Sequence, residues 1–155
     1  MSQDIKKMED LYAEHAEYIC DDRLEEWTEL FADDCVYRII SRVNHERKLP
    51  LNILLAESKG ALIDRVTAIR NTMVYLPRYV THMTSNMRIT QSNSDLLASR
   101  SHIAVYQTLI EGSARIHLVG RTFDQIDTSE ARWKFVSRVV VFDNELIAGS
   151  VVYPV

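Results

Sequence analysis

The stretch from residue 21 to residue 38 constrains the fold most, because a helical pattern ends there and a strand pattern begins within a few residues. Apolar residues spaced three or four apart share one helical face: Leu24, Trp27, Leu30 and Phe31. The acidic pair Asp33-Asp34 is typical of a turn, and an alternating strand pattern follows it: Cys35, Tyr37 and Ile39. The sequence therefore predicts a short helix over residues 24–31 that packs directly on the start of a curved sheet.

Helical periodicity also predicts a first helix of about four turns and a third helix over residues 58–72. The first helix carries a continuous apolar stripe: Ile5, Met8, Leu11, Tyr12, His15, Ala16 and Ile19. A short strand is expected over residues 37–42. The polar segment 44–50 that follows ends in Pro50, and we expect it to leave the sheet as an excursion whose role stays open.

After Pro77 the residue types change, since four runs rich in Val, Ile, Thr and aromatic residues alternate with short polar turns. The runs cover residues 79–90, 96–110, 114–126 and 132–142. The turns are short enough for hairpins, so these runs predict a long antiparallel meander. Helices followed by a meander are typical of an α+β domain, in which a strongly curved, mixed or antiparallel sheet wraps around the N-terminal helices. We therefore expect residues 1–155 to form a single cone-shaped domain with a central cavity.

Length, charge and cysteine content narrow the class of protein. A chain of 155 residues can bury about 70% of the surface that it exposes when unfolded, so neither metals nor disulfides are needed to hold it. Its net charge is −4, from 18 basic and 22 acidic residues with no basic block, which argues against nucleic acid as a partner. The two cysteines favour buried thiols in a cytoplasmic protein. An apolar signal core and a run of eighteen apolar residues are both missing, so we expect neither export nor a membrane span.

The last of the four runs is apolar on both faces, which predicts a cover on each side of it. Trp133 and Phe135 share one face, while Val136, Val140 and Phe142 lie on the other. The helices of the cone can cover one face, and the second face indicates another protein chain. Arginine on strands is also typical of interfaces, where its planar fork pairs with carboxylates. The interface candidates are therefore Arg138, Val140, Phe142, Arg100 and Arg121.

Five short motifs follow one another along most of the chain. They are Asp22-Arg23-x-Glu25-Glu26-Trp27-x-x-Leu30-Phe31-x-Asp33-Asp34, Asp64-Arg65-Val66-x-x-Ile69-Arg70, His82-x-x-Ser85-Asn86-x-x-Ile89, Gly120-x-x-Phe123-Asp124, and Phe135-x-x-Arg138-x-Val140-Val141-x-Asp143 followed by Pro154. In order and spacing, the sequence resembles the small (β) subunits of the aromatic-ring-hydroxylating (Rieske non-haem iron) dioxygenases. That family has the cone fold of the nuclear-transport-factor-two-like superfamily, also called cystatin-like. The segment 40–45 with Leu49-Pro50 is similar to small subunits of salicylate-type and terephthalate-type oxygenases, which act on hydroxylated or carboxylated benzenes.

The resemblance implies a structural subunit without redox chemistry of its own. In the family, the Rieske iron-sulfur cluster and the mononuclear non-haem iron lie in the larger α subunit. The residues agree, because a Rieske cluster needs Cys and His close in sequence, and neither Cys20 nor Cys35 has a His two or three positions away. We therefore expect no catalytic, cofactor-binding or metal-binding residue in this chain. The implied partners are the α subunit and two further copies of the chain, in a hexamer of three α and three β subunits that acts in aromatic catabolism.

Two other functions stay open from the residues alone. His82 on a strand could act as a general base with Asp34 or Tyr37, in a stand-alone isomerase or dehydratase of the same cone fold. The cone could also bind a small ligand without catalysis. Alternation places His82 with Asn86 on one face and Met83 with the apolar residues on the other, so we expect His82 to point out of the cone. A structural role is the simpler interpretation, in which His82 hydrogen-bonds locally and Asp34 forms the turn after the helix.

Overall fold

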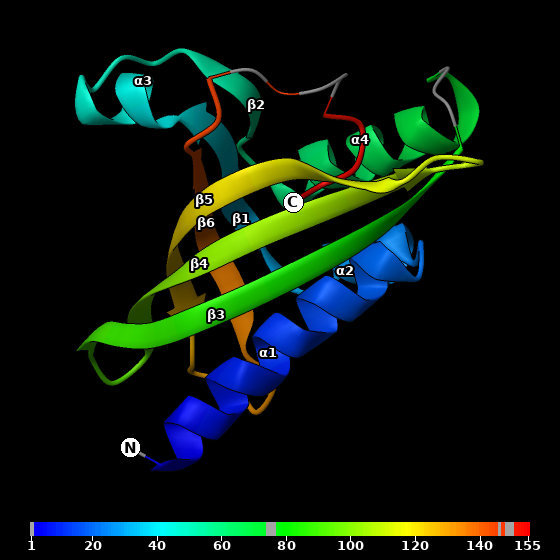
Figure 1. Cartoon of the computed structure of the whole chain (residues 1–155). Helices are drawn as coiled ribbons and strands as arrows, with labels where there is room; N and C mark the ends of the chain where they lie inside the picture. The colour runs from blue at the N-terminus through cyan, green and yellow to red at the C-terminus, as the bar shows by residue number, and fades with distance from the viewer. Residues whose placement is uncertain (1, 74–76, 146, 148–150) are drawn as a thin grey trace.

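A six-stranded sheet curls around the long N-terminal helix and forms a cone (Figure 1). The structure is a computed structural model that describes residues 2–73, 77–145, 147 and 151–155. Its elements are α1 (Ser2–Cys20), α2 (Leu24–Thr28), β1 (Phe31–Ser41), α3 (Arg42–Glu46), β2 (Asn52–Ala56), α4 (Lys59–Asn71), β3 (Arg78–Ser92), β4 (Leu96–Leu109), β5 (Ala114–Asp127) and β6 (Lys134–Phe142). The strand order across the sheet is β2-β1-β6-β5-β4-β3. The predicted α+β cone is confirmed.

The predicted helices are present, and their ends have local causes. α4 begins after Ser58, whose hydroxyl accepts a hydrogen bond from the Ala61 N–H at 3.1 Å, as a typical helix N-cap does. α1 buries most of its apolar stripe inside the cone. α2 stops at Thr28, earlier than predicted, because Phe31 already begins β1. None of the described helices combines the length and the apolar character that a membrane crossing requires.

The four long strands β3 to β6 form the predicted antiparallel meander. β1 then pairs in parallel with β6 and in antiparallel fashion with the short edge strand β2, so the sheet is mixed. Sequence periodicity missed β2 and the five-residue helix α3, because each is too short to show a period. The segment 44–50, expected to leave the sheet, contains the end of α3 and leads into β2.

Aromatic side chains from helices and strands fill the inside of the cone. Trp27 and Phe31 pack edge to face with ring centroids 4.9 Å apart, and Phe31 also packs on Phe135 at 5.4 Å. The last described residues join this core, because Arg65 on α4 donates a hydrogen bond to the carbonyl oxygen of Val151 at 2.8 Å. The interior is therefore built from both ends of the sequence.

A β-bulge in β3 reverses the predicted alternation around His82. Asn86 adopts a left-handed conformation with φ 53°, and the register with β4 shifts between Ser85 and Arg88. His82 consequently points into the core and is 6% exposed, whereas Met83 is 56% exposed. The expectation that His82 points out of the cone is wrong, because the alternation of the apolar residues after the bulge does not extend back across it.

A second bulge, in β6, explains the apolar residues at both odd and even positions of the last strand. Val136 is the extra residue there, because Phe135 pairs with Ile126 and the next paired residue is Ser137. Phe135 and Val140 therefore share the inner face, and both are fully buried. α3 contacts β6 as well. Part of the cover that was expected from another chain thus comes from the chain itself.

Candidate functional site

The structure does not bring the three candidate catalytic residues together. Asp34 is exposed at the start of β1, while His82 and Tyr37 are buried in the core. The Tyr37 hydroxyl donates to the carbonyl oxygen of Val155 and accepts from the Val155 N–H, both at 2.8 Å. Burial raises the pKa of Tyr37 to about 12. Tyr37 is therefore a structural contact, since the backbone of Val155 uses both hydrogen-bonding roles of its hydroxyl.

His82 is poorly suited to act as a general base. Its ring lies beside that of His15, with centroids 5.3 Å apart, and the ring nitrogens of both have no hydrogen-bond partner among the described residues. Burial, and then the positive charge of Arg138, lower the pKa of His82 to about 3, and burial also lowers the pKa of His15. A catalytic base works best with a pKa near the working pH. Both imidazoles are therefore neutral groups of the core.

A buried polar cluster around Asp124 joins α1, β4, β5 and β6. One oxygen of Asp124 accepts three hydrogen bonds, from Arg138 Nη1 at 2.9 Å, from the Thr122 hydroxyl at 2.8 Å, and from the Tyr12 hydroxyl. The Tyr12 hydroxyl also lies 3.0 Å from Ser99 Oγ. The side chains of Arg138 and Asp124 are both completely buried. Polar side chains from four elements of the fold thus gather around one ion pair.

The ion pair lowers the cost of burying the charges of Arg138 and Asp124 inside the protein. Burial raises the pKa of the Asp124 carboxyl, and the charge of Arg138 opposes that rise. The cost of taking both ions out of water offsets much of their attraction, so such a pair adds little net stability but is costly to break. The guanidinium carbon of Arg138 also lies 5.2 Å from the centre of the Phe135 ring. The cluster fixes α1, β5 and β6 in relation to one another, which is a structural task.

Sequence reasoning missed Tyr12, His15 and Asp124 as buried polar groups. The first two stand in the apolar stripe of the first helix, and periodicity does not show which polar partner such a residue meets. A signal for Asp124 does exist, because it has the same parity in β5 as the buried residue Ile126. A carboxylate on the inner face of a strand needs a cation, and Arg138 lies directly opposite in β6.

The described residues do not fit an iron site. They contain no group of three or more His, Cys, Asp or Glu side chains that could hold a metal ion. Cys20 and Cys35 are separate free thiols, and burial raises the pKa of Cys35 to about 11, which disfavours the thiolate that binds metals. The described part of the chain therefore offers neither the Cys and His set of a Rieske cluster nor a mononuclear iron site.

The structure divides the five interface candidates into two groups. Arg138 and Val140 have no exposed surface, and Phe142 is buried as well, so the interface prediction for these three is wrong. The prediction assumed regular alternation along β6, and the bulge at Val136 changes the face on which the residues after it lie. Arg100 is exposed and Arg121 is partly exposed, and both lie on the outer face of the sheet. Neither forms an ion pair with another described residue, so these two remain candidates.

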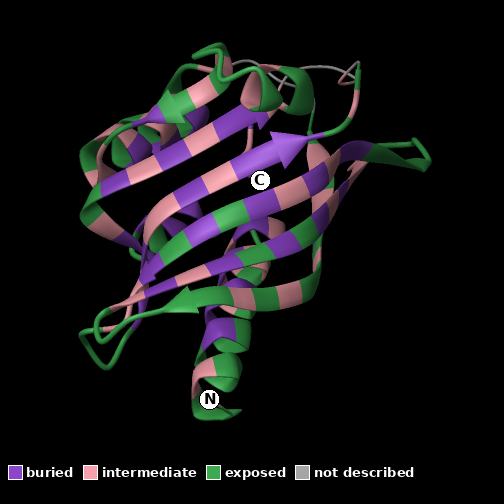
Figure 2. Ribbon diagram, turned by 90° about the vertical axis from the view of Figure 1, so that its left-hand side faces the viewer, coloured by how far each residue is buried: buried purple, intermediate pink, exposed green. Residues whose placement is uncertain are grey.

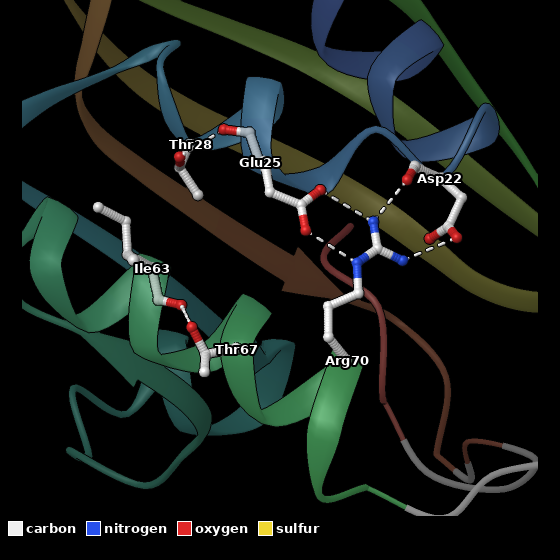
Figure 3. A network of polar contacts seen from close by, with 6 residues as sticks. All are labelled: Asp22, Glu25, Thr28, Ile63, Thr67 and Arg70. Atoms are coloured by element: carbon white, nitrogen blue, oxygen red, sulfur yellow. Dashed lines mark hydrogen bonds and ion pairs between the residues drawn. The ribbon is translucent and has the colours of Figure 1, made fainter.

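A surface groove of about 370 Å³ separates α2 from α4. Arg70 borders it and ties α4 to the start of α2, since it donates to the carboxylate of Asp22 at 2.8 Å and to that of Glu25 at 2.9 and 3.0 Å (Figure 3). The hydrogen bonds from Arg70 lower the pKa of Glu25 to about 2. Thr67, also drawn in Figure 3, donates to the carbonyl oxygen of Ile63 within α4. The charges beside this groove are thus paired with one another and hold helices together.

Known proteins share both the sequence and the fold. Residues 14–149 match the family described as the ring hydroxylating beta subunit. The anthranilate 1,2-dioxygenase small subunit of Burkholderia cepacia is 26% identical over 158 residues, which cover 100% of this chain and 98% of that protein. The terephthalate 1,2-dioxygenase terminal oxygenase component subunit beta 1 of a Comamonas species is 24% identical over 132 residues, which cover 85% of this chain and 86% of that one.

A solved structure from Novosphingobium aromaticivorans agrees with the sequence matches. It is assigned as the beta subunit of an aromatic-ring-hydroxylating dioxygenase, and it superposes with a TM-score of 0.87 at 31% identity. The superposition covers 96% of this chain and 95% of that chain. The family match spans the end of α1, the other helices and the whole sheet, and includes the Arg138–Asp124 pair. The chain therefore belongs to the family of ring-hydroxylating β subunits.

Proposed function

We propose that this chain is the structural small subunit of an aromatic-ring-hydroxylating dioxygenase, where it organises large subunits that carry the Rieske cluster and the mononuclear iron. The match of residues 14–149 to the β-subunit family carries the proposal. The core supports it, because Tyr37 and the Arg138–Asp124 pair are committed to internal hydrogen bonds. The chain contributes shape and surface to the complex, and the large subunit contributes the redox chemistry.

The proposed substrate class of the whole complex is a carboxylated benzene. Two relatives are named for anthranilate and terephthalate, and both compounds carry a carboxylate on a benzene ring. Because the proposed iron lies in the large subunit, the contacts with the substrate belong there too. This chain acts on the substrate only through the assembly that it supports.

The proposed assembly is a cytoplasmic hexamer with three small and three large subunits. Closed rings of identical subunits are common among soluble oligomers, and a ring of three needs one surface on each copy to fit a different surface on the next. The outer face of the sheet is the surface proposed for this contact, because Arg100 and Arg121 lie there without ion pairs to other described residues. The helical side of the cone is less suited to this contact, because charged side chains there already pair with one another, as Arg70 does with Glu25.

Co-purification and turnover test this proposal. Expressed with its large subunit, the chain should purify in a complex whose mass equals three copies of each, and the isolated chain should be colourless and free of iron. His82→Ala should keep near-normal turnover of an aromatic acid per intact complex in the presence of the reductase. Met83→Ala, on the neighbouring exposed position, is the matched control. A hundredfold drop for His82→Ala alone, roughly what loss of a general base costs, with assembly and iron content unchanged, would move chemistry into this chain.

A further inference from the structure

Several buried polar atoms inside the cone have no hydrogen-bond partner among the described residues. Figure 2 shows buried positions alternating with more exposed ones along the strands, and polar side chains occupy some of the buried positions. The unpaired atoms are both ring nitrogens of His15 and of His82, Nε and Nη2 of Arg138, and Oδ1 of Asp124. Such a group is unusual, because buried polar atoms in folded proteins are nearly always hydrogen-bonded.

The unpaired atoms belong to one part of the core, in which the ring of Phe135 is a common neighbour. The ring centroids of His15 and His82 are 5.3 Å apart, and that of His15 is 5.7 Å from that of Phe135. The guanidinium carbon of Arg138 lies 5.2 Å from the centre of the same Phe135 ring. Arg138 bonds Asp124 through Nη1 and Oδ2, which leaves the other polar atoms of the pair unused. The core therefore contains a polar region among its aromatic side chains.

This polar region offers both donors and acceptors of hydrogen bonds. Nε and Nη2 of Arg138 only donate, and the carboxylate oxygen Oδ1 of Asp124 only accepts. Burial and the charge of Arg138 lower the pKa of His15 and of His82, so both imidazoles are neutral. A neutral imidazole has one N–H donor and one acceptor nitrogen. A molecule that satisfies the whole region must therefore both donate and accept.

The charges of the region favour a neutral molecule over an ion. The positive charge of Arg138 is already balanced by the negative charge of Asp124. A further anion would leave a net negative charge in the core, and Arg138 would repel a cation, so either ion is costly there. Water is neutral, donates and accepts, and is small enough for a packed interior. Folded proteins hold about one buried water per 27 residues, which corresponds to roughly six for a chain of 155 residues.

We propose that the core binds internal water molecules, which bridge the rings of His15 and His82 to the buried ion pair. A bridging water is nearly as favourable as a direct hydrogen bond. The site draws on α1, β3, β5 and β6, so bound water connects the helix inside the cone with strands at both ends of the meander. This inference goes beyond the proposed function, because it concerns the interior of the chain and involves no partner.

Magnetic relaxation dispersion of water tests the site in the isolated full chain, because its amplitude reports water that a protein holds for long times. His82→Leu removes a donor and an acceptor and should lower the amplitude by the contribution of roughly one water molecule. His82→Gln keeps a donor and an acceptor and should retain most of the amplitude. His102→Leu, at an exposed position of β4, is the matched control and should leave the amplitude unchanged. Thermal unfolding shows whether each variant is folded.

A crystal structure of the original chain is a second measurement, which holds even if His82→Leu does not fold. The expected result is electron density for water within about 2.7–3.2 Å of a ring nitrogen of His15 or His82. Ring nitrogens that contact only carbon atoms, or an amplitude that His82→Leu leaves unchanged, would overturn the inference.

Two further results would show a different occupant and also overturn it. One is an anomalous peak beside Arg138 after a bromide soak, which identifies an anion site. The other is an organic molecule that the purified chain releases on denaturation and that mass spectrometry detects. The proposed function is tested separately, since it depends on complex formation with the large subunit and not on what the core contains.

Discussion

Arg138 and Arg100 lie on strands of one sheet, but their surroundings are opposite. Arg138 faces inward, has no exposed surface and is bonded to Asp124 at 2.9 Å. Arg100 faces outward on β4 and has no ion pair with another described residue. A charge that is buried within a chain needs its partner from the same chain, whereas an outward-facing charge can take its partner from another molecule. The inner face of the sheet therefore serves folding, and the assembly proposed above uses the outer face.

The largest expected effect comes from breaking the inner pair. Asp124→Ala leaves the charge of Arg138 buried without a partner, and we expect it to lower the free energy of unfolding by about 3–5 kcal/mol. Asp34→Ala removes an exposed carboxylate, serves as the matched control, and should change that free energy by less than about 0.5 kcal/mol. Urea unfolding in neutral buffer measures both values. Similar losses for the two variants would contradict the division between the faces.

The buried histidines should make the protein less stable in acid. In the folded state the pKa values of His15 and His82 lie below the ordinary value of 6.5, and that of His82 is about 3. Below pH 6.5 the unfolded chain binds protons that the folded chain does not, so this stability is present above that pH and is lost as the pH falls. We expect a loss of about 1 kcal/mol per histidine for each pH unit between about pH 6 and pH 5.

Two histidine variants test the same comparison between the core and the outer face of the sheet. His82→Leu should reduce this dependence of the unfolding free energy on pH by about half, because one of the two imidazoles with a lowered pKa is gone. His102→Asn, on the outer face, should leave that dependence as it is in the original chain. Urea unfolding at a series of pH values gives the slope for each protein. Equal slopes for His82→Leu and the original chain would show that His82 does not resist protonation.

The ion pairs between helices should have an intermediate effect. Arg70 has 30% of its side chain exposed and bonds both Asp22 and Glu25, so it belongs neither to the core nor to a free surface. Arg70→Met should lower the free energy of unfolding by about 1 kcal/mol, a value typical of a partly exposed network. The loss should shrink at high salt, which screens exposed charges. Arg115→Met is the control, and a loss that does not respond to salt would point to packing of the side-chain stem instead.

The smallest effect on folding should come from a substitution on the outer face of the sheet. Arg100→Met removes a charge that faces Arg88, so the free energy of unfolding should stay within about 0.5 kcal/mol of its original value or rise slightly. Self-association should weaken in the same variant, because the contact proposed for the outer face loses one of its charges. Unfolding and sedimentation measured on one preparation separate the two effects. A large loss of stability together with unchanged assembly would reverse the assignment of the two faces.

Periodicity predicted most of the fold, because the long elements repeat their pattern often enough to be read. The helix over residues 58–72 and all four runs after Pro77 are present with nearly the predicted ends. Short elements such as α3 and β2 could not be predicted, since five residues are too few to define a period. The cone itself followed from the order of the elements and from the resemblance to a family.

The site was harder to predict than the fold, and bulges are the physical reason. One extra residue at Val136 moved Arg138 to the inner face, and the bulge at Asn86 did the same for His82. A sequence does not show where a strand gains an extra residue, yet every side chain beyond that point changes face. The pairing of Asp124 with Arg138 depends on register between strands, which local pattern does not contain. Arg100 and Arg121 lie on the outer face of the sheet, so an interface there stays a prediction for these two.

The parallel pairing of β1 with β6 has a consequence for how the protein is made. Ile39 lies beside Val140, so these strands are neighbours in the sheet although about 100 residues separate them, and closing such a loop is costly in chain entropy. On the ribosome β6 emerges after the other five strands. Until then, the edge of β1 that pairs with β6 has no partner strand. Chains that depend on such distant contacts fold slowly and are prone to aggregate while incomplete. We therefore expect the newly made chain to be prone to aggregation until its last strand is synthesised, and a chain truncated before residue 134 should not fold.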